Sequence, residues 1–289
     1  MIVALYLHDI VIRAVYYVAN LREVGLMRKI VSIFMVLTLL LVMMAGCDKK
    51  STKEDTEVYV FIAASLSNVF TELQDMYKES NPEVTILLNA DSSGTLKEQI
   101  EEGAECDIFF SAAEKQMAQL SQEGYINKES IIDMLENKVV LIKPKNKETA
   151  VTSFETIPKA RSIALAGEDV PVGAYAREIL TNLGILSEVN KMQVNEAANV
   201  TAVLAAVVEE SNEVGVVYAT DAASVAEQVD IIAEAPKESL ATKVIYPVAL
   251  VNNNDASQSQ IEAAKEFLTF LSTSTAKNVF VKYGFTVTN

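Results

Sequence analysis

The sequence predicts an α/β protein built from two lobes, and three observations support this prediction. From Glu57 onward, short β-branched runs alternate with amphipathic stretches of helical length, which is typical of largely parallel strands connected by helices. The length of 289 residues allows one large or two ordinary domains. No internal repeat, low-complexity tract or flexible linker separates the halves, so two lobes joined by crossing strands fit better than two independent domains.

The first half of this region alternates strands with helices. Val58–Ile62 is predicted as a strand, and Leu66–Glu79 as a helix whose apolar residues fall on one face. Asp91–Gly94 has the composition of a turn, after which a helix is expected to open at Thr95 with a capping box. The other expected elements are strands at 84–88, 107–110 and 138–142 and a helix at 113–122.

The second half of this region shows the same alternation of strands and helices. A loop is expected at Gly167–Gly173, followed by a helix from Tyr175 to Asn182 that closes at Gly184. A further helix is expected at Asn199–Glu210. The remaining elements are strands at 162–165, 214–218, 230–233 and 244–250 and two C-terminal helices at 257–272 and 275–283.

Charge and histidine content exclude several function classes. The formal net charge of −15 argues against a nucleic-acid binder, because such proteins present basic faces that neutralise phosphates. The one histidine, His8, lies upstream of a segment that we interpret as a cleaved signal. A Ser-His-Asp triad, a Cys-His pair and a His-ligated zinc site are therefore excluded from the processed chain.

The N-terminal region has the pattern of an export signal. Ile30–Ala45 is almost wholly apolar and follows Arg28 and Lys29, and its length is short for a spanning helix. The sequence Met44-Ala45-Gly46-Cys47 resembles a bacterial lipobox, in which the cysteine is lipidated and becomes the first residue of the mature chain. That resemblance implies that Cys47 anchors the protein to a membrane by its acyl chains; an uncleaved anchor helix is the alternative.

The segments on either side of the predicted signal contain charged and polar residues. Residues 1–26 fit no signal, because charged residues such as Asp9 and Arg13 interrupt their apolar stretches. We interpret them as an extension that results from a misassigned upstream start codon. The true start is then Met27, and the signal covers residues 27–46. A short cytoplasmic extension is the alternative. Residues 47–56 are polar and are predicted to be a tether between lipid and fold.

Polar or glycine-containing turns recur between a strand end and a helix start. Helix N-termini carry unsatisfied N–H groups and positive dipole ends, so several that converge would form an anion site without any Lys or Arg. Taken alone, each turn also fits ordinary helix capping. The turns are Ala64-Ser65, Ser92-Ser93-Gly94, Val172-Gly173 and Asn199-Val200.

Six motifs follow one another along the chain between about Glu57 and Phe285. They are Ala63-Ala64-Ser65-Leu66-Ser67-Asn68, Asp91-Ser92-Ser93-Gly94-Thr95-Leu96, Val170-Pro171-Val172-Gly173-Ala174-Tyr175-Ala176, Gly215-Val216-Val217-Tyr218-Ala219-Thr220-Asp221-Ala222, Tyr246-Pro247-Val248 and Tyr283-Gly284-Phe285. In their combination and order, these motifs resemble those of the molybdate-binding proteins that serve ABC importers as extracytoplasmic receptors.

The resemblance implies a fold and a set of site residues. The fold is the two-lobed, type II periplasmic-binding-protein fold, in which each lobe is a mixed, mostly parallel sheet flanked by helices and the ligand lies in the interlobe cleft. Residues 57–137 and 246–289 are expected to form lobe 1, and residues 138–245 lobe 2. By the resemblance, Ser65 and Ser93 each supply a hydroxyl and a backbone N–H, Val172 and Val200 supply backbone N–H groups, and Tyr218 supplies its phenolic hydroxyl.

The resemblance also implies a function. We expect a non-enzymatic, monomeric receptor, anchored outside the cytoplasm through Cys47, that binds molybdate or tungstate without a cofactor or a metal cation. We expect its partners to be the permease of an ABC importer and the ATPase of that importer. We do not expect it to bind nucleic acid. A receptor for another tetrahedral oxyanion such as sulfate, an exported hydrolase using paired carboxylates, and a surface adhesin or scaffold are the alternatives.

Overall fold

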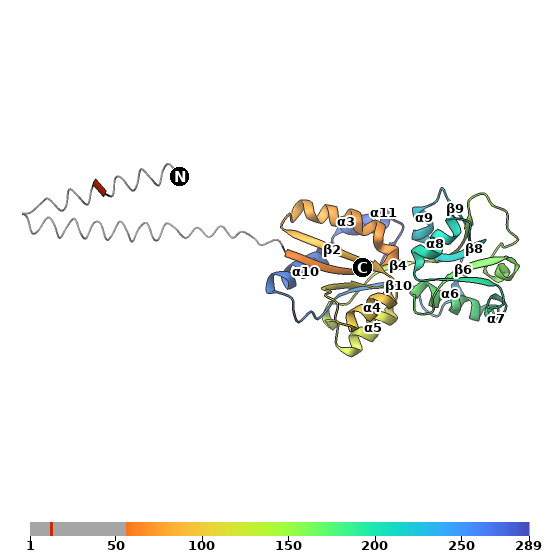
Figure 1. Ribbon diagram of the computed structural model, residues 1–289, viewed down its shortest axis with the longest axis horizontal. Coiled ribbons are helices and arrows are strands. Elements are labelled where there is room, and N and C mark those ends of the chain that lie inside the picture. The colour runs from red at the N-terminus through yellow and green to blue at the C-terminus, as the bar shows by residue number, and fades with distance from the viewer. Residues whose placement is uncertain (1–11, 14–55, 289) are drawn as a thin grey trace, which may run out of the picture. The chain divides into compact units, whose positions relative to one another are not determined.

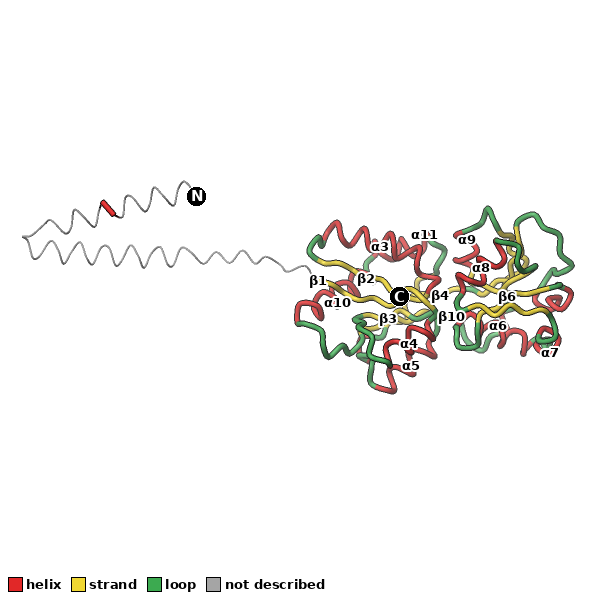
Figure 2. Tube along the Cα trace, in the orientation of Figure 1, coloured by secondary structure: helices red, strands yellow, loops and turns green. Residues whose placement is uncertain are grey.

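A computed structural model describes residues 12–13 and 56–288 of the chain. Glu54–Asn289 forms one compact unit, and Met1–Lys53 is a separate unit in which only residues 12 and 13, both helical, are described. Within residues 56–288, the strands form two mixed sheets, each flanked by helices (Figures 1 and 2). We call the six-stranded sheet with its helices lobe 1 and the five-stranded sheet with its helices lobe 2. The predicted α/β class with two lobes is confirmed.

The sheet of lobe 1 has the strand order β11-β4-β10-β3-β1-β2. β1 pairs in parallel with β2 and β3, whereas β10 runs antiparallel to β3 and β4, and β11 antiparallel to β4. The strands are β1 (Thr56–Ala63), β2 (Val84–Asp91), β3 (Ile108–Phe110), β4 (Ile132–Asn137), β10 (Val244–Leu250) and β11 (Thr286–Val287).

The sheet of lobe 2 repeats this plan with the order β7-β6-β8-β5-β9. β6 pairs in parallel with β7 and β8, and β5 runs antiparallel to β8 and β9. β10 in lobe 1 and β5 in lobe 2 each run antiparallel to both of their neighbours. Both strands begin directly after the chain crosses from the other lobe. The strands are β5 (Val139–Pro144), β6 (Ser162–Ala166), β7 (Gln193–Ala197), β8 (Val214–Tyr218) and β9 (Val229–Glu234).

The chain crosses between the sheets twice. Lys138 alone separates β4 of lobe 1 from β5 of lobe 2, and residues 235–243 return the chain from β9 to β10. Asn137, at the end of β4, is buried and donates from Nδ2 to the Thr220 hydroxyl of lobe 2 at 2.8 Å. The residue ranges predicted for the two lobes stay a prediction.

Helices cover both faces of each sheet. In lobe 1, α3 packs beside α11 and α4 beside α5, and in lobe 2, α6 and α8 lie on opposite faces of the sheet (Figure 1). The helices are α3 (Ser67–Ser80), α4 (Ser93–Glu101), α5 (Glu114–Glu123), α6 (Pro171–Asn182), α7 (Leu186–Val189), α8 (Val200–Val208), α9 (Ala219–Ser224), α10 (Gln258–Leu271) and α11 (Ser274–Lys282), with short 3₁₀ turns η1 (Ala64–Leu66), η2 (Lys128–Ser130), η3 (Phe154–Lys159) and η4 (Lys237–Ser239).

An aromatic cluster fixes α3 and α11 against the sheet of lobe 1. The ring of Phe70 meets that of Phe110 edge to face with centroids 5.8 Å apart, and Phe280 lies 6.1 Å from Phe110. All three side chains are fully buried. Edge-to-face pairs of this kind add about 0.5 to 1.5 kcal/mol beyond the burial of their area. The cluster therefore holds both helices in place relative to β3.

Two predicted helix starts are wrong, and in both cases the helix begins earlier. α4 starts at Ser93 rather than Thr95, because Ser92 is the N-cap and its Oγ accepts from the Thr95 N–H at 3.1 Å. α6 starts at Pro171, inside the predicted loop, because proline suits the first position of a helix, where an N–H has no partner. Strands β4, β7 and β11 and helices α7 and α9 were not predicted.

The predicted extension, signal segment and lipid-anchor residue Cys47 lie outside the described residues, apart from residues 12 and 13. The predicted tether ends at residue 56, and Thr56 is the first residue of β1. Among the residues that the structure describes, none of the helices combines the length and the apolar character needed to cross a membrane.

Candidate functional site

The five residues predicted to bind the ligand all line one small cavity between the lobes. The cavity has a volume of about 10 Å³. Lobe 1 contributes Ser65 and Ser93, and lobe 2 contributes Val172, Val200 and Tyr218. Residues that lie far apart in the sequence are therefore brought together at one point, which is the convergence that the pattern of turns required.

The strand directions explain this convergence. Each of the five residues lies at or just beyond the carboxyl end of a strand, and in open α/β sheets ligands bind outside those ends. Ser65 follows β1, Ser93 follows β2, Val172 follows β6, Val200 follows β7, and Tyr218 is the last residue of β8. Because all of these strands run parallel within their own sheets, their carboxyl ends lie on one side of each lobe.

Three helices begin at the cavity, and they differ in how they are capped. Ser92 caps α4 as described above, and in α8 the Asn199 Oδ1 accepts from the N–H of Ala202 at 3.0 Å. Helix α6 has no capping side chain, because its N-cap residue is Val170. The N–H groups of Ser93, Val172 and Val200 fall in the first two positions of their helices, where helix geometry provides no acceptor.

The serine hydroxyls are held by neighbouring groups. The Oγ of Ser93 accepts from the backbone N–H of Ala112 at 2.9 Å, which leaves its own hydrogen to donate elsewhere. The Oγ of Ser65 lies 2.9 Å from the hydroxyl of Tyr246, which also accepts from Asn137 Nδ2 at 3.2 Å. Both hydroxyls are thus fixed in position at the cavity wall.

Tyr218 is the most unusual side chain of the site. Only 1% of its surface is exposed, and its hydroxyl has no hydrogen-bond partner among the described residues. Burial, followed by the neighbouring Tyr246, raises the pKa of the Tyr218 phenol well above its ordinary value, so the group stays protonated at neutral pH. An unpaired buried hydroxyl costs about 1 to 3 kcal/mol, so an acceptor at this point of the cavity fits the site.

Charged side chains are almost absent from the cavity wall. Among the described residues that line it there is no lysine or arginine, and Asp91 is the one carboxylate. Arg177, which lies in α6, pairs instead with Glu196 at 2.7 Å and Glu168 at 3.3 Å. The cavity therefore presents neutral donors, with helix dipoles as the source of positive potential.

The five predicted binding residues did not include Asp91, Asn199 or Tyr246, although each lies in a turn or motif recognised in the sequence. Asn199 Nδ2 donates across the cleft to Asp91 Oδ1 at 3.0 Å, and Tyr246 supports Ser65 from β10. Asn199 was recognisable as a helix cap, and Asp91 as the first residue of a turn. Nothing in the sequence could show that the two residues meet.

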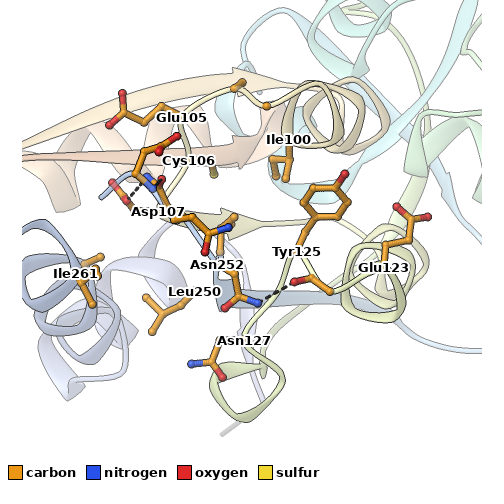
Figure 3. Close-up of a pocket in the computed structure, with 18 of the residues that line it drawn as sticks. Ile100, Glu105, Cys106, Asp107, Glu123, Tyr125, Asn127, Leu250, Asn252 and Ile261 are labelled. Carbon is orange, nitrogen blue, oxygen red and sulfur yellow. Dashed lines mark hydrogen bonds between the residues drawn. The ribbon is translucent and has the colours of Figure 1, made fainter. Parts of the chain in front are cut away.

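A larger hollow on lobe 1 has a different character (Figure 3). It measures about 1080 Å³, and none of the five predicted residues lines it. Its buried carboxylate, Asp107, accepts from the N–H of Tyr59 at 2.8 Å and from the side-chain amides of Asn253 and Gln260 at 3.0 Å. Asp107 therefore ties β1 to the C-terminal part of the lobe and is fully engaged in that role.

Comparison with known proteins shows matches over most of the chain. The family model described as bacterial extracellular solute-binding protein matches residues 58–286. The Bacillus subtilis protein YvgL, provisionally named an ABC transporter substrate-binding lipoprotein, is 37% identical over 260 residues, covering 88% of this chain and 97% of that protein. The molybdate-binding protein ModA of Haemophilus influenzae is 36% identical over 237 residues, covering 79% of this chain and 89% of that protein.

A solved structure extends the likeness to the fold. The periplasmic molybdate-binding protein of Azotobacter vinelandii superposes with a TM-score of 0.68 at 19% identity, covering 80% of this chain and 100% of that one. The type II periplasmic-binding-protein fold expected from the motifs is thereby confirmed.

Proposed function

The chain belongs to the family of bacterial extracellular solute-binding proteins, and on that premise we propose that it is the molybdate receptor of an ABC importer. Tungstate, which shares the charge and shape of molybdate, is the second ligand that we propose. The relative from Haemophilus influenzae, named as molybdate-binding, supports this choice. We further propose Ser65, Ser93, Val172, Val200 and Tyr218 as the residues that bind the anion.

The buried, unpaired hydroxyl of Tyr218 is the observation that carries the proposal. It lies in a cavity where helix N-termini from both lobes supply further donors, so a small acceptor is the ligand that fits. Hydrogen bonds from neutral donors to an oxyanion are stronger than those between two neutral groups. The helix dipoles add to this attraction because they act at contact distance.

The wall of the cavity favours an anion without protons. A protonated oxyanion such as hydrogen phosphate would need an acceptor in the site, and Asp91 is the one carboxylate among the described wall residues. Its Oδ1 already accepts from the N–H of Ser92 at 2.7 Å and from Asn199 Nδ2 at 3.0 Å. Molybdate and tungstate carry no proton near neutral pH, so they match the donors. Sulfate shares this property, so the donors alone do not separate it from the larger anions.

We also propose where the receptor works. Lipidation of Cys47 would tether it to the outer side of the cell membrane, and the name of the Bacillus subtilis relative, which includes the word lipoprotein, supports this anchor. The receptor would act as a monomer, close its lobes on the anion, and present the closed surface to the permease, which works with its ATPase. Closure can signal loading because the permease distinguishes the two states by differential affinity.

Isothermal titration calorimetry tests the ligand. The full chain, purified in detergent, is titrated with sodium molybdate, tungstate, sulfate and phosphate in turn. We expect one-to-one binding of molybdate and tungstate and no heat of binding for the other two. Tight binding of sulfate alone would assign the receptor to another oxyanion. The absence of binding heat with all four anions would refute the proposal of an oxyanion receptor.

A further inference from the structure

We propose that the hydrogen bond between Asp91 and Asn199 is a latch that holds the two lobes closed over the ligand. Asp91 ends β2 of lobe 1, and Asn199 precedes α8 of lobe 2. The bond from Asn199 Nδ2 to Asp91 Oδ1 measures 3.0 Å and joins positions 108 residues apart. This inference rests on the proposed function, because the latch acts on a bound anion.

The two partners are held in the orientation that the latch needs. The Oδ1 of Asn199 accepts from the N–H of Ala202 at 3.0 Å, so the amide nitrogen must point away from α8 and toward lobe 1. The Oδ1 of Asp91 also accepts from the N–H of Ser92 at 2.7 Å, which fixes the carboxylate at the start of α4. The latch therefore ties together the N-termini of α4 and α8.

The position of the latch couples it to the ligand. Ser93 and Val200, two of the proposed ligand donors, are the first residues of α4 and α8 and directly follow the helix caps. When the lobes separate, the bond between Asp91 and Asn199 must break together with the shared contacts to the anion. The latch thus adds to the free energy that opposes opening and slows release of the ligand.

The negative charge of Asp91 connects the latch to the electrostatics of the bound anion. A carboxylate in the wall of an anion cavity repels the ligand, and each donor that it binds reduces that repulsion. Ser92 belongs to the same lobe and serves Asp91 in any position of the lobes, whereas Asn199 reaches it only across the cleft. Closure therefore improves the electrostatic environment of the anion as well as enclosing it.

Neighbouring contacts show that the lobes meet closely at this edge of the cleft. Gln116 Nε2 of lobe 1 donates to the backbone oxygen of Asp169 in lobe 2 at 3.3 Å. Gly94 packs against the same peptide, and a Cβ at this position would overlap the Asp169 backbone oxygen. These contacts involve neutral groups, so the bond to the Asp91 carboxylate is the stronger one.

The variant Asn199→Asp separates latching from helix capping. Aspartate keeps an oxygen that caps Ala202, but it replaces the donor with a second carboxylate facing Asp91. We expect molybdate to dissociate about 10 to 150 times faster, the range for a lost hydrogen bond to a charged group. The thermal unfolding temperature without ligand should stay unchanged. Asn254→Asp, on an exposed loop of lobe 1, is the matched control for added negative charge.

A paired exchange provides the second test. In the double variant Asp91→Asn with Asn199→Asp, the new amide at position 91 can donate to the new carboxylate at position 199, so the bond returns with reversed direction. We expect slow dissociation to be largely regained. Dissociation rates are measured by stopped-flow competition with excess tungstate on the full chain in detergent.

The outcomes separate the latch from the proposed function. If the wild type binds molybdate and Asn199→Asp releases it at the wild-type rate, the latch is overturned and the receptor function stands. If the double variant releases molybdate as fast as Asn199→Asp, the direct bond is overturned as the cause. If the wild type binds none of the oxyanions, the proposed function fails and the latch fails with it.

Discussion

Replacing Tyr218 by phenylalanine should weaken molybdate binding by about 10- to 150-fold without lowering the stability of the ligand-free protein. The substitution removes a single oxygen atom from a side chain that is 1% exposed, so it creates almost no cavity. A hydrogen bond to a charged ligand contributes about 1.5 to 3 kcal/mol, which corresponds to that loss of affinity. The hydroxyl has no partner among the described residues, so no stabilising bond is lost from the ligand-free protein.

Tyr246→Phe is the matched control for this prediction. Its hydroxyl contacts Ser65 at 2.9 Å and Asn137 at 3.2 Å, so its removal should lower the free energy of unfolding by about 1 to 3 kcal/mol, the sum of two ordinary hydrogen bonds. Affinity is measured by calorimetry and stability by urea unfolding without ligand. If Tyr218→Phe binds molybdate as tightly as the wild type, or if it alone loses stability, the role assigned to Tyr218 as an anion donor is refuted.

Three further predictions concern the cleft and its surroundings. Ser65→Ala or Ser93→Ala should each weaken anion binding by about 1.5 to 3 kcal/mol with little loss of fold, and normal affinity in both would contradict the residue assignment. Gly94→Ala should reduce affinity while leaving the unfolding temperature of the ligand-free protein unchanged, since its Cβ meets the Asp169 backbone only where the lobes touch; equal affinity would show that the lobes need not approach this closely. Burial raises the pKa of Asp221 from 3.8 to about 7, so the folded protein retains a proton that the unfolded chain releases. The stabilising contribution of this carboxyl therefore decreases as the pH rises from about 4 to about 7, and Asp221→Asn should gain stability relative to the wild type across that window in thermal unfolding, whereas a constant difference would refute the shift.

The elements with strong apolar patterns could be predicted from the sequence. The predicted strands at 214–218 and 244–250 coincide with β8 and β10, because both are continuous apolar runs that are buried in their sheets. β7 was missed because its residues, Gln193–Ala197, are mostly polar and exposed at the edge of the sheet. The start of α6 was missed because Val170-Pro171-Val172-Gly173 has the composition of a turn, whereas proline here occupies the first helical position.

Some features of the site could also be predicted from the sequence, whereas others could not. The turns before α4 and α8 could be recognised from the preference of serine and asparagine for helix caps, and the resemblance to a known family chose the five binding residues. Their convergence depends on the strand order of two sheets, which no local pattern contains. The contact between Asp91 and Asn199, and the support of Ser65 by Tyr246 from 181 residues away, are products of that topology alone.

The missing cap of α6 would give a bound anion a second role. Helices α4 and α8 each have a side-chain cap, because Ser92 accepts from the N–H of Thr95 and Asn199 from the N–H of Ala202. Helix α6 begins with Pro171 after Val170, and neither residue can cap it. An oxyanion bound at the Val172 N–H would complete this turn from outside, so ligand and helix would stabilise each other. Loss of the anion would then loosen the first turn of α6, so release of the ligand would change the backbone of lobe 2.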